Sequence, residues 1–360
     1  MEVIKFVIKR LLNGILVMFG VVLLVFGLFN ILPVNSARLT LGQRADVATV
    51  AAIEKEFRLN LPWYHRLMLY FNDLSPVSFN NQLNEDAPSH LNPDEVSFTP
   101  LFTVGEICVV MKAPYLGKSF QTREKVSSIL ASKIFATFIL AIISMIIASI
   151  IGIVMGVFAA VKQSTFWDNL ILVFSTFGNS QPAYFSAMLL AMVFGYYLAE
   201  YTGLNVHGSL TAVNDYGEDY YAWQNLILPV LALSVRPVAI ITQLTRSSML
   251  DALSQDYIRT ARAKGLSYYA VVFKHALRNA LNPVVTSISG WLAALLTGAF
   301  FIERVFSYDG LGLKTIQSLL SFDFPVVMGG VLLVALIFVI MNILTDILYS
   351  VLDPRVTVKA

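Results

Sequence analysis

The chain has 360 residues, of which 57% are hydrophobic and 13% are charged, and its mean hydropathy is +0.70. Soluble domains carry roughly 25% charged residues, so this composition excludes a soluble globular protein and indicates an integral membrane protein. The net charge of +2 decides little, since membrane topology depends on the charge of each loop. The single cysteine, Cys108, excludes an internal disulfide.

The first predicted element is a transmembrane helix over residues 1–33. It begins with Lys5, Lys9 and Arg10 and continues with apolar residues. A signal peptide has an apolar region of about 7–15 residues followed by a cleavage site with small residues. The run here is longer, near the ~20 residues that a span needs, and no such site follows. We therefore expect a retained helix with its N-terminus in the cytoplasm.

Residues 34–125 form a long polar segment that we place outside the membrane. Its first part predicts two short amphipathic helices, with Asp46 as a helix cap and a break at Leu61-Pro62. Residues 75–114 are rich in asparagine, proline and serine and show no sustained periodicity. They predict a loop or a small irregular cap.

The second and third predicted spans cover residues 133–160 and 167–198. In the second, Gly152 and Gly156 have the GxxxG spacing that permits close helix packing. In the third, the GNSQP motif at residues 178–182 predicts an interruption or bend near mid-membrane. Irregular backbone at that depth is tolerated where it is buried in protein or lines a cavity, so Ser180 and Gln181 are candidates for the substrate pathway.

Three further spans are predicted over residues 223–245, 284–301 and 325–352. Residues 199–222 carry four acidic and no basic residues, which fits an outer loop. The two termini, the turn at Lys162 and residues 246–283 are basic. By the positive-inside rule, six spans then place both termini in the cytoplasm.

Arg236 is the arginine that lies well inside a predicted span. Burial in the bilayer is costly, so its side chain should face a cavity or a partner rather than lipid. One interpretation is that Arg236 lines the substrate pathway and meets a carboxylate of the cargo. The alternative, at least as well supported, is that it pairs with a carbonyl exposed by Pro237 or with a partner subunit.

The polar stretch over residues 246–283 carries six basic residues against two acidic ones. Residues 255–264 predict a helix with Asp256 in its first turn and basic side chains in its last, which suits the helix dipole. Gly265 is expected to end this helix and Ser267 to cap another. The residues leave two interpretations open: a helix that docks on another protein, or a basic loop that fixes topology and contacts anionic lipid.

The chain shows no sequence signature of an enzyme. Gly117-Lys118-Ser119 lacks the glycine five residues earlier that a phosphate-binding loop requires, because Lys112 stands there. The histidines show no metal-ligand spacing, and no nucleophile–base pair is evident. We therefore expect a non-enzyme without a metal or cofactor of its own.

Residues 256–266, DYIRTARAKGL, and 275–283, HALRNALNP, resemble the coupling loop of ABC importer permeases, in the dipeptide/oligopeptide family and its first permease subunit. Arg259-Thr260-Ala261 stands at the family's Glu-Ala-Ala and Gly265 at its glycine. His275-x-Leu277-Arg278 stands at Ile-x-Leu-Pro, a departure typical of the peptide branch. Val34-Asn35-Ser36 replaces the usual Gly-Asp-Pro. Further stretches that resemble the family are residues 32–33, 115–120, 306–312 and 352–355.

The resemblance implies the type I ABC importer permease fold, an all-α membrane protein with six transmembrane helices and a long extracytoplasmic segment after the first. It implies a bacterial inner-membrane permease that works with a second permease subunit, usually as a heterodimer. Two cytoplasmic ATPase subunits and an extracytoplasmic solute-binding protein complete the assembly. ATP and magnesium are then bound by the ATPase subunits, and this chain holds no cofactor.

In that family the loop helix sits in a groove of the ATPase, whose closure around ATP moves the helix as a lever. The resemblance places the ATPase contact in the coupling loop, residues 246–283. Its contact residues are then Arg259, Thr260, Ala261 and Gly265, with Asp256 and Arg262 in support.

The predicted domain division is an N-terminal helix over 1–33, the extracytoplasmic segment over 34–125 and a permease core over 126–360. Residues 77–113 have no counterpart in the family and look like an insertion. We expect this insertion to contact the solute-binding protein or to cap the permease.

The cargo stays open between di- or oligopeptides and other solutes carried on this scaffold, namely nickel chelates, glutathione or another peptide-like solute. A secondary transporter is a weaker alternative, because ion coupling usually needs acidic or histidine residues within spans. Asp346 lies near the end of the sixth span, and no pair of repeated halves is evident. A non-transporting scaffold would not need the coupling-loop pattern.

Overall fold

The computed structural model describes residues 2–31, 54–84, 87–93, 95–214 and 216–352. Residues 32–53, which include Asp46 and Val34-Asn35-Ser36, and residues 353–360 lie outside the described part. The chain divides into two compact units. The core unit comprises Met1–Leu16, Lys133–Lys314 and Val334–Ala360, and the sheet unit comprises Val17–Ser132 and Thr315–Leu333.

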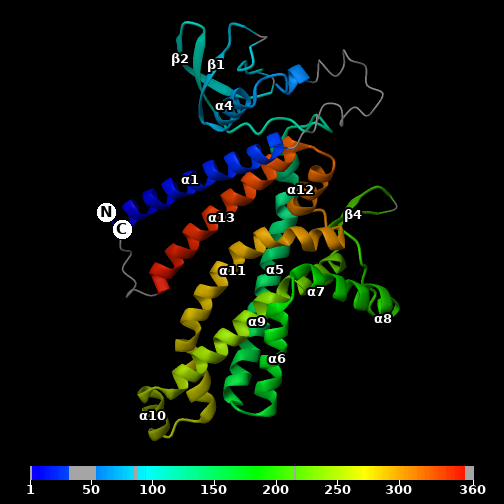
Figure 1. Cartoon of the computed structure of the whole chain (residues 1–360). Helices are drawn as coiled ribbons and strands as arrows, with labels where there is room; N and C mark the ends of the chain where they lie inside the picture. The colour runs from blue at the N-terminus through cyan, green and yellow to red at the C-terminus, as the bar shows by residue number, and fades with distance from the viewer. Residues whose placement is uncertain (1, 32–53, 85–86, 94, 215, 353–360) are drawn as a thin grey trace. The chain divides into compact units, whose positions relative to one another are not determined.

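Five described helices are long and apolar enough to cross a membrane. They confirm five of the six predicted spans, and Figure 1 labels each of them. The second begins earlier than Lys133, the residue predicted to start it. The five helices are α1 (Glu2–Ile31), α5 (Val126–Val161), α9 (Gln224–Ser254), α11 (Leu277–Phe306) and α13 (Phe324–Leu352).

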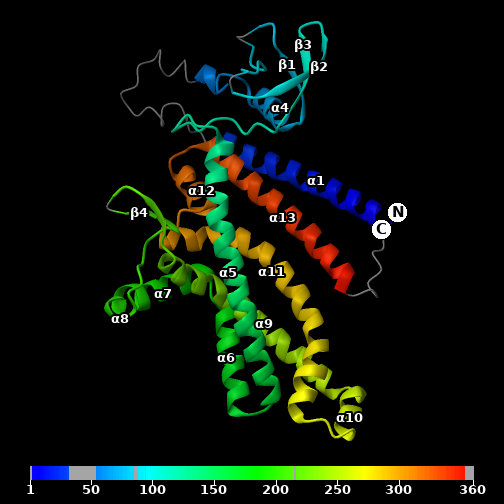
Figure 2. The ribbon, with the colours of Figure 1, turned by 180° about the vertical axis from the view of Figure 1, so that it is seen from behind.

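The predicted third span is broken into shorter helices. Helix α6 (Phe166–Ser180) ends before Gln181, whose backbone is extended, and α7 (Ala183–Leu190) begins after Pro182. Proline lacks an N–H group and disfavours helical backbone at the residue before it, so the interruption falls where the sequence predicts it. Figure 2 shows the change of direction between α6 and α7. The π-helix η1 (Ala191–Tyr197) and α8 (Ala199–Thr202) follow.

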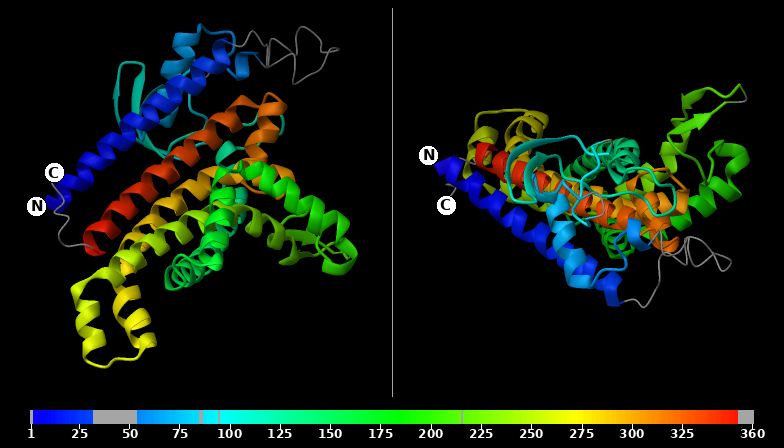
Figure 3. Two further views of the ribbon diagram at one scale, coloured as in Figure 1. Left: turned by 60° about the horizontal axis from the view of Figure 1, so that its bottom comes forward. Right: turned by 90° about the horizontal axis from the view of Figure 1, so that it is seen from above.

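Helix α9 continues through residues 246–254, which the sequence analysis assigned to a loop. The short helix α10 (Asp256–Ala263) follows, and the π-helix η2 (Ala270–Ala276) leads directly into α11. Figure 3 shows α9, α10 and α11 as one hairpin with α10 at its tip. Residues 246–283 are therefore mostly helical.

Pro283 lies inside α11, although the sequence predicted that a new helix starts after it. A spanning helix tolerates proline where side chains and neighbouring helices satisfy the freed backbone groups. Polar side chains bond to backbone carbonyls on either side of it: Asn279 Nδ2 donates to His275 O at 3.2 Å, and Thr286 Oγ1 donates to Asn282 O at 3.1 Å.

Helices α5 and α9 cross at glycines. A Cβ added to Gly152 would lie 2.7 Å from Ile241 Cγ2, and one added to Gly156 would lie 2.5 Å from Thr245 Cβ. Real Cβ atoms do not approach that closely, so the absence of side chains lets the two backbones meet. The close packing predicted from the GxxxG spacing is confirmed.

The sheet unit contains a three-stranded antiparallel sheet in the order β1-β3-β2. Its strands are β1 (Val77–Asn81), β2 (Phe98–Val104) and β3 (Ile107–Lys112), with Val77 opposite Met111. The expected loop or irregular cap over residues 75–114 is therefore wrong. The runs that form β2 and β3 are rich in β-branched and aromatic residues, and Gly105, at φ +61°, turns the chain between them.

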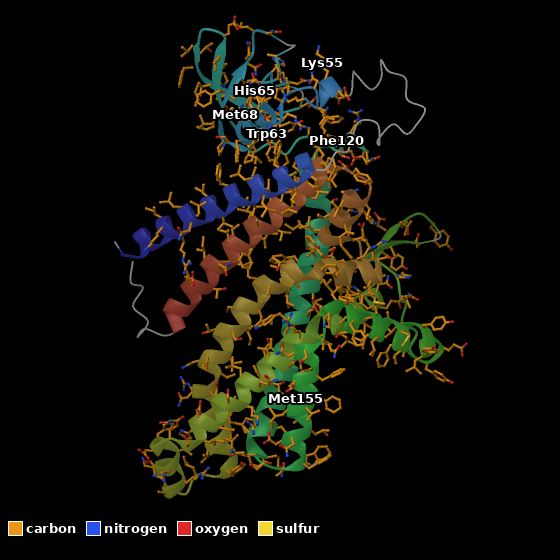
Figure 4. All side chains as sticks on the ribbon, viewed as in Figure 1. Lys55, Trp63, His65, Met68, Phe120 and Met155 are labelled. Carbon is orange, nitrogen blue, oxygen red and sulfur yellow. The ribbon has the colours of Figure 1, made fainter. Side chains whose placement is uncertain are left out.

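The second predicted amphipathic helix is confirmed as α4 (Trp63–Leu74), which starts after the Leu61-Pro62 break. Figure 4 labels Trp63, His65 and Met68 on this helix. Trp63 and Met68 are exposed, whereas Asp73 is buried and accepts a hydrogen bond from Arg58 Nη1 at 2.6 Å. Two shorter elements connect the long helices: the hairpin β4 (Thr211–Val213) with β5 (Asp219–Tyr221) precedes α9, and α12 (Leu311–Leu320), which ends in the sheet unit, follows α11.

A buried carboxylate joins three helices of the core unit. Glu303 of α11 is fully buried and accepts hydrogen bonds from Thr137 Oγ1 of α5 at 2.6 Å and from Leu313 N of α12 at 2.9 Å. A Cβ on Gly310 would lie 2.5 Å from this carboxylate, so the connection to α12 needs glycine there. Glu303 therefore fixes the start of α12 against α5.

Replacement of Glu303 with alanine is expected to lower the free energy of unfolding by about 2–5 kcal/mol, because a cavity forms and two buried donors lose their acceptor. Glu303→Gln keeps one acceptor oxygen and should cost less. The check is thermal unfolding of both purified variants in detergent. An alanine variant as stable as the parent chain would refute this role.

Candidate functional site

Helix α10 is seated on the chain's own apolar core. Its Ile258 and Ala261 are buried, at 0% and 6% exposure. They belong to one cluster with Met249 of α9 and with Val271 and Val272 of η2. Movement of α10 therefore cannot occur without strain on the ends of α9 and η2, because packed interiors resist deformation.

The outer face of α10 carries the polar residues. Asp256 and Arg259 have side chains 94% and 83% exposed, and they form an ion pair at 3.5 Å that contributes little to stability at such exposure. Thr260 Oγ1 donates to Asp256 O at 3.1 Å, and Arg262 is exposed in the last turn. These four side chains are free to meet another molecule, whereas Ala261 faces inward.

Gly265 ends α10 in the left-handed region, with φ +74°. Its N–H donates to Arg262 O at 3.0 Å, and no atom lies within 4 Å of a Cβ built on it. Ser267 Oγ then accepts a hydrogen bond from Ala270 N at 3.4 Å. Both caps predicted from the sequence are confirmed.

Aromatic side chains beside α10 were missed by the sequence reasoning. Tyr257, Tyr268, Tyr269 and Phe273 are exposed, and the rings of Tyr269 and Phe273 stack with centroids 6.3 Å apart. Exposed tyrosine and phenylalanine near cationic groups are typical of protein interfaces. The available signal was the spacing of four residues between Tyr269 and Phe273, which places both on one helix face.

An ion pair joins the first turn of α6 to the later part of α9. The guanidinium of Arg246 binds the carboxylate of Asp168 through two hydrogen bonds: Nε donates to Oδ1 at 2.6 Å and Nη2 donates to Oδ2 at 2.7 Å. Asp168 also accepts a hydrogen bond from Ser164 N, and its side chain is 1% exposed. From the sequence, Arg246 is predictable only as one charge of a basic stretch, and no local pattern predicts a role for Asp168.

The pathway candidates lie near one another along α6 and α9. A Cβ added to Gly178 would lie 3.4 Å from Val235 Cγ1, so the break that holds Ser180 and Gln181 is close to the helical turn of Arg236. Ser180 Oγ donates to Thr176 O at 2.8 Å. Arg236 is exposed, and its guanidinium carbon lies 5.8 Å from the ring centre of Trp291 in α11. Among the described residues, no hydrogen bond joins Arg236 to Ser180 or Gln181.

Comparison with known families gives two matches. Residues 152–358 match the family described as binding-protein-dependent transport system inner membrane component, and residues 3–88 match its N-terminal model. The chain belongs to this permease family.

Two similar proteins cover nearly the whole chain. The permease is 32% identical over 366 residues to the dipeptide transport system permease protein DppB of Alkalihalophilus pseudofirmus, with 98% of each chain covered. It is 34% identical over 355 residues to the glutathione transport system permease protein GsiC of Escherichia coli K12, with 99% of each covered.

These matches establish the class of the permease. It is a permease subunit of an ABC importer of the dipeptide/oligopeptide family, with the type I importer fold, in the bacterial inner membrane. The family predicted from the sequence resemblance is confirmed. Within the described residues, no group of three or more histidine, cysteine or acidic side chains forms a metal site.

Proposed function

We propose that the permease couples closure of cytoplasmic ATPase subunits to the import of di- or oligopeptides or similar small solutes. The observation that carries this proposal is α10, an exposed helix seated on the ends of α9 and η2. A docking partner that moves α10 would move both helices, and with them the path between them. The competing view of a simple basic anchor does not explain why α10 packs so tightly.

The ATPase contact is assigned to Gly265 and to the exposed face of the preceding helix α10, which carries Asp256, Arg259, Thr260 and Arg262. Cationic side chains pair with acidic groups across an interface, and the aromatic residues nearby supply contact area. Ala261 contributes indirectly: it is buried on the inward side of α10, where its small side chain lets the helix lie close to the core. ATP and magnesium are bound by the ATPase subunits.

The working assembly contains a second permease subunit, two ATPase subunits and an extracytoplasmic solute-binding protein, with both termini of this chain in the cytoplasm. A heterodimer of permeases is the expected form. Residues 77–113, which hold the three-stranded sheet, are expected to contact the solute-binding protein or to cap the permease.

The proposed cargo is a small peptide-like solute. Dipeptides and glutathione, the solutes in the names of the two relatives, both contain a peptide bond and a free carboxylate. Nickel chelates are carried on the same scaffold and remain an alternative cargo. Ser180, Gln181 and Arg236 are the proposed residues of the pathway.

A secondary transporter is disfavoured by the environment of Asp346. Its Oδ2 lies 2.7 Å from Arg10 Nη2, so the carboxylate is compensated within the chain. Ion coupling needs a carboxylate that can release its partner and take up an ion or proton. Asp346 is therefore a poor candidate for that role.

Gly265→Trp tests the docking role of α10. We expect uptake by the reconstituted importer to fall about tenfold or more, in the range of typical coupling energies, while the protein level in the membrane is unchanged. The measurement is solute uptake and ATP hydrolysis in proteoliposomes.

The matched control is Gly217→Trp, at another exposed glycine with positive φ (+82°), in the outer β4–β5 turn. Gly265→Asn is a second control, because asparagine tolerates left-handed backbone and adds little bulk. Normal uptake by Gly265→Trp would exclude the docking role.

A further inference from the structure

Helix α11 presents a polar face within a membrane-spanning segment. Asn282, Thr286 and Ser289 recur at helical spacing, and all three lie in the candidate span Ala270–Thr297. Thr286 Oγ1 and Ser289 Oγ donate to backbone carbonyls of their own helix. Gly290 follows, exposed and with no atom within 4 Å of an added Cβ. Polar faces at this depth belong against protein or a water-filled cavity rather than lipid.

Trp291, nine residues after Asn282, lies on the other side of α11, so the helix is polar on one side and carries Trp291 beside Arg236 of α9 on the other. The guanidinium carbon of Arg236 is 5.8 Å from the ring centre of Trp291, within the range of a cation–π contact. Arg236 is twelve residues into α9, about 18 Å along the helix axis from Gln224. The cation therefore lies deep in the span, against the side of α11 that carries Trp291.

The same helix offers a comparison. Arg246 has both ends of its guanidinium fork bound to Asp168. For Arg236, the part of the chain described here supplies no carboxylate and no hydrogen-bond acceptor. The contact with the Trp291 ring gives Arg236 no hydrogen-bond acceptor, and the N–H donors of a guanidinium fit the two oxygens of a carboxylate. A guanidinium at this depth with no partner in the described part of the chain needs an anion to compensate its charge. The carboxylate of a transported solute supplies one.

We propose that Arg236 is a specificity-determining residue that binds the free carboxylate of the transported solute, with Trp291 holding the guanidinium in place. This inference rests on the proposed import of small peptide-like solutes and adds the chemistry of recognition inside the membrane. It predicts that the permease itself selects against solutes whose carboxylate is blocked, independently of the solute-binding protein.

The test uses the importer complex without its solute-binding protein, in detergent, with dialanine and alanyl-alaninamide as probes. The parent complex is expected to bind dialanine about tenfold or more tightly than the amide, the size of a charged hydrogen bond. Arg236→Gln should bind both probes with equal, low affinity, and Arg236→Lys should retain part of the preference. Absence of discrimination in the parent complex, or unchanged discrimination in Arg236→Gln, would overturn the proposal.

A second measurement tests the alternative that Arg236 binds an acidic residue of the second permease subunit instead of the solute. If Arg236 pairs with that subunit, Arg236→Gln should weaken copurification of the two permeases, and this result would also overturn the proposal. If the complete parent importer takes up no dialanine, the proposed cargo class fails. If the parent importer and Arg236→Gln take it up equally, only the role of Arg236 fails.

Discussion

Gly156→Leu will prevent the permease from forming its native helix packing. A side chain at this position begins 2.5 Å from Thr245 Cβ and 2.7 Å from the backbone oxygen of Thr242. Overpacking typically costs about 1–3 kcal/mol, and the cost rises when the obstacle is backbone that cannot rotate away. Helices α5 and α9 must then separate, which disrupts the core on which α9 depends. The expected result is a large loss of monodisperse protein after extraction in mild detergent.

Gly20→Leu in α1 is the matched control, since no atom lies within 4 Å of a Cβ at Gly20. Both substitutions add the same apolar side chain to a glycine within a spanning helix. The control should give parental yield and a parental melting temperature. If Gly156→Leu behaved in the same way, the close approach of α5 and α9 would be refuted.

Asp168→Ala is also expected to destabilise the permease strongly. Removing one partner of a buried ion pair leaves an uncompensated charge and costs about 3–5 kcal/mol. Arg246 keeps some contact with solvent, at 21% side-chain exposure, so the lower end of that range is expected. The variant also removes the acceptor for Ser164 N. The measurement is the melting temperature of the purified protein, with the ATPase partners absent.

The double variant Asp168→Ala/Arg246→Met distinguishes pairing from packing. Replacing both charges with apolar groups is often close to neutral, so it should be more stable than Asp168→Ala alone. A double-mutant cycle with Arg246→Met measures the coupling energy. Strictly additive effects of the two substitutions would show that the pair contributes nothing beyond its separate contacts.

Several features followed from local sequence signals. The extent of α10, its end at Gly265 and the break before Pro182 depend on helix capping, positive φ and the missing N–H of proline. These act within a few residues, so short stretches encode them. The GxxxG spacing in α5 likewise indicated a close helix contact, but not its partner helix.

Other features depend on contacts between distant residues. Asp168 and Arg246 are 78 residues apart, and no pattern in either stretch points to the other. The inward position of Ala261 is decided by η2 and α9, which pack beneath it. The three-stranded sheet was missed because β1 pairs with β3 across an intervening segment, and because Pro100 and a bulge interrupt β2. Tertiary pairing outweighs local composition in such segments.

Helix α9 runs without a break from Gln224 to Ser254, despite Pro229 and Pro237 inside it. Arg236 and Ser254, the last residue of α9 before α10, therefore lie on one continuous helix, about 27 Å apart along its axis. Thermodynamic reciprocity then applies to these two points: if ATPase closure changes the affinity for solute by some factor, bound solute changes the closure equilibrium by the same factor. Solute bound to the permease would thus change the closure equilibrium of the ATPase subunits through a single helix, α9.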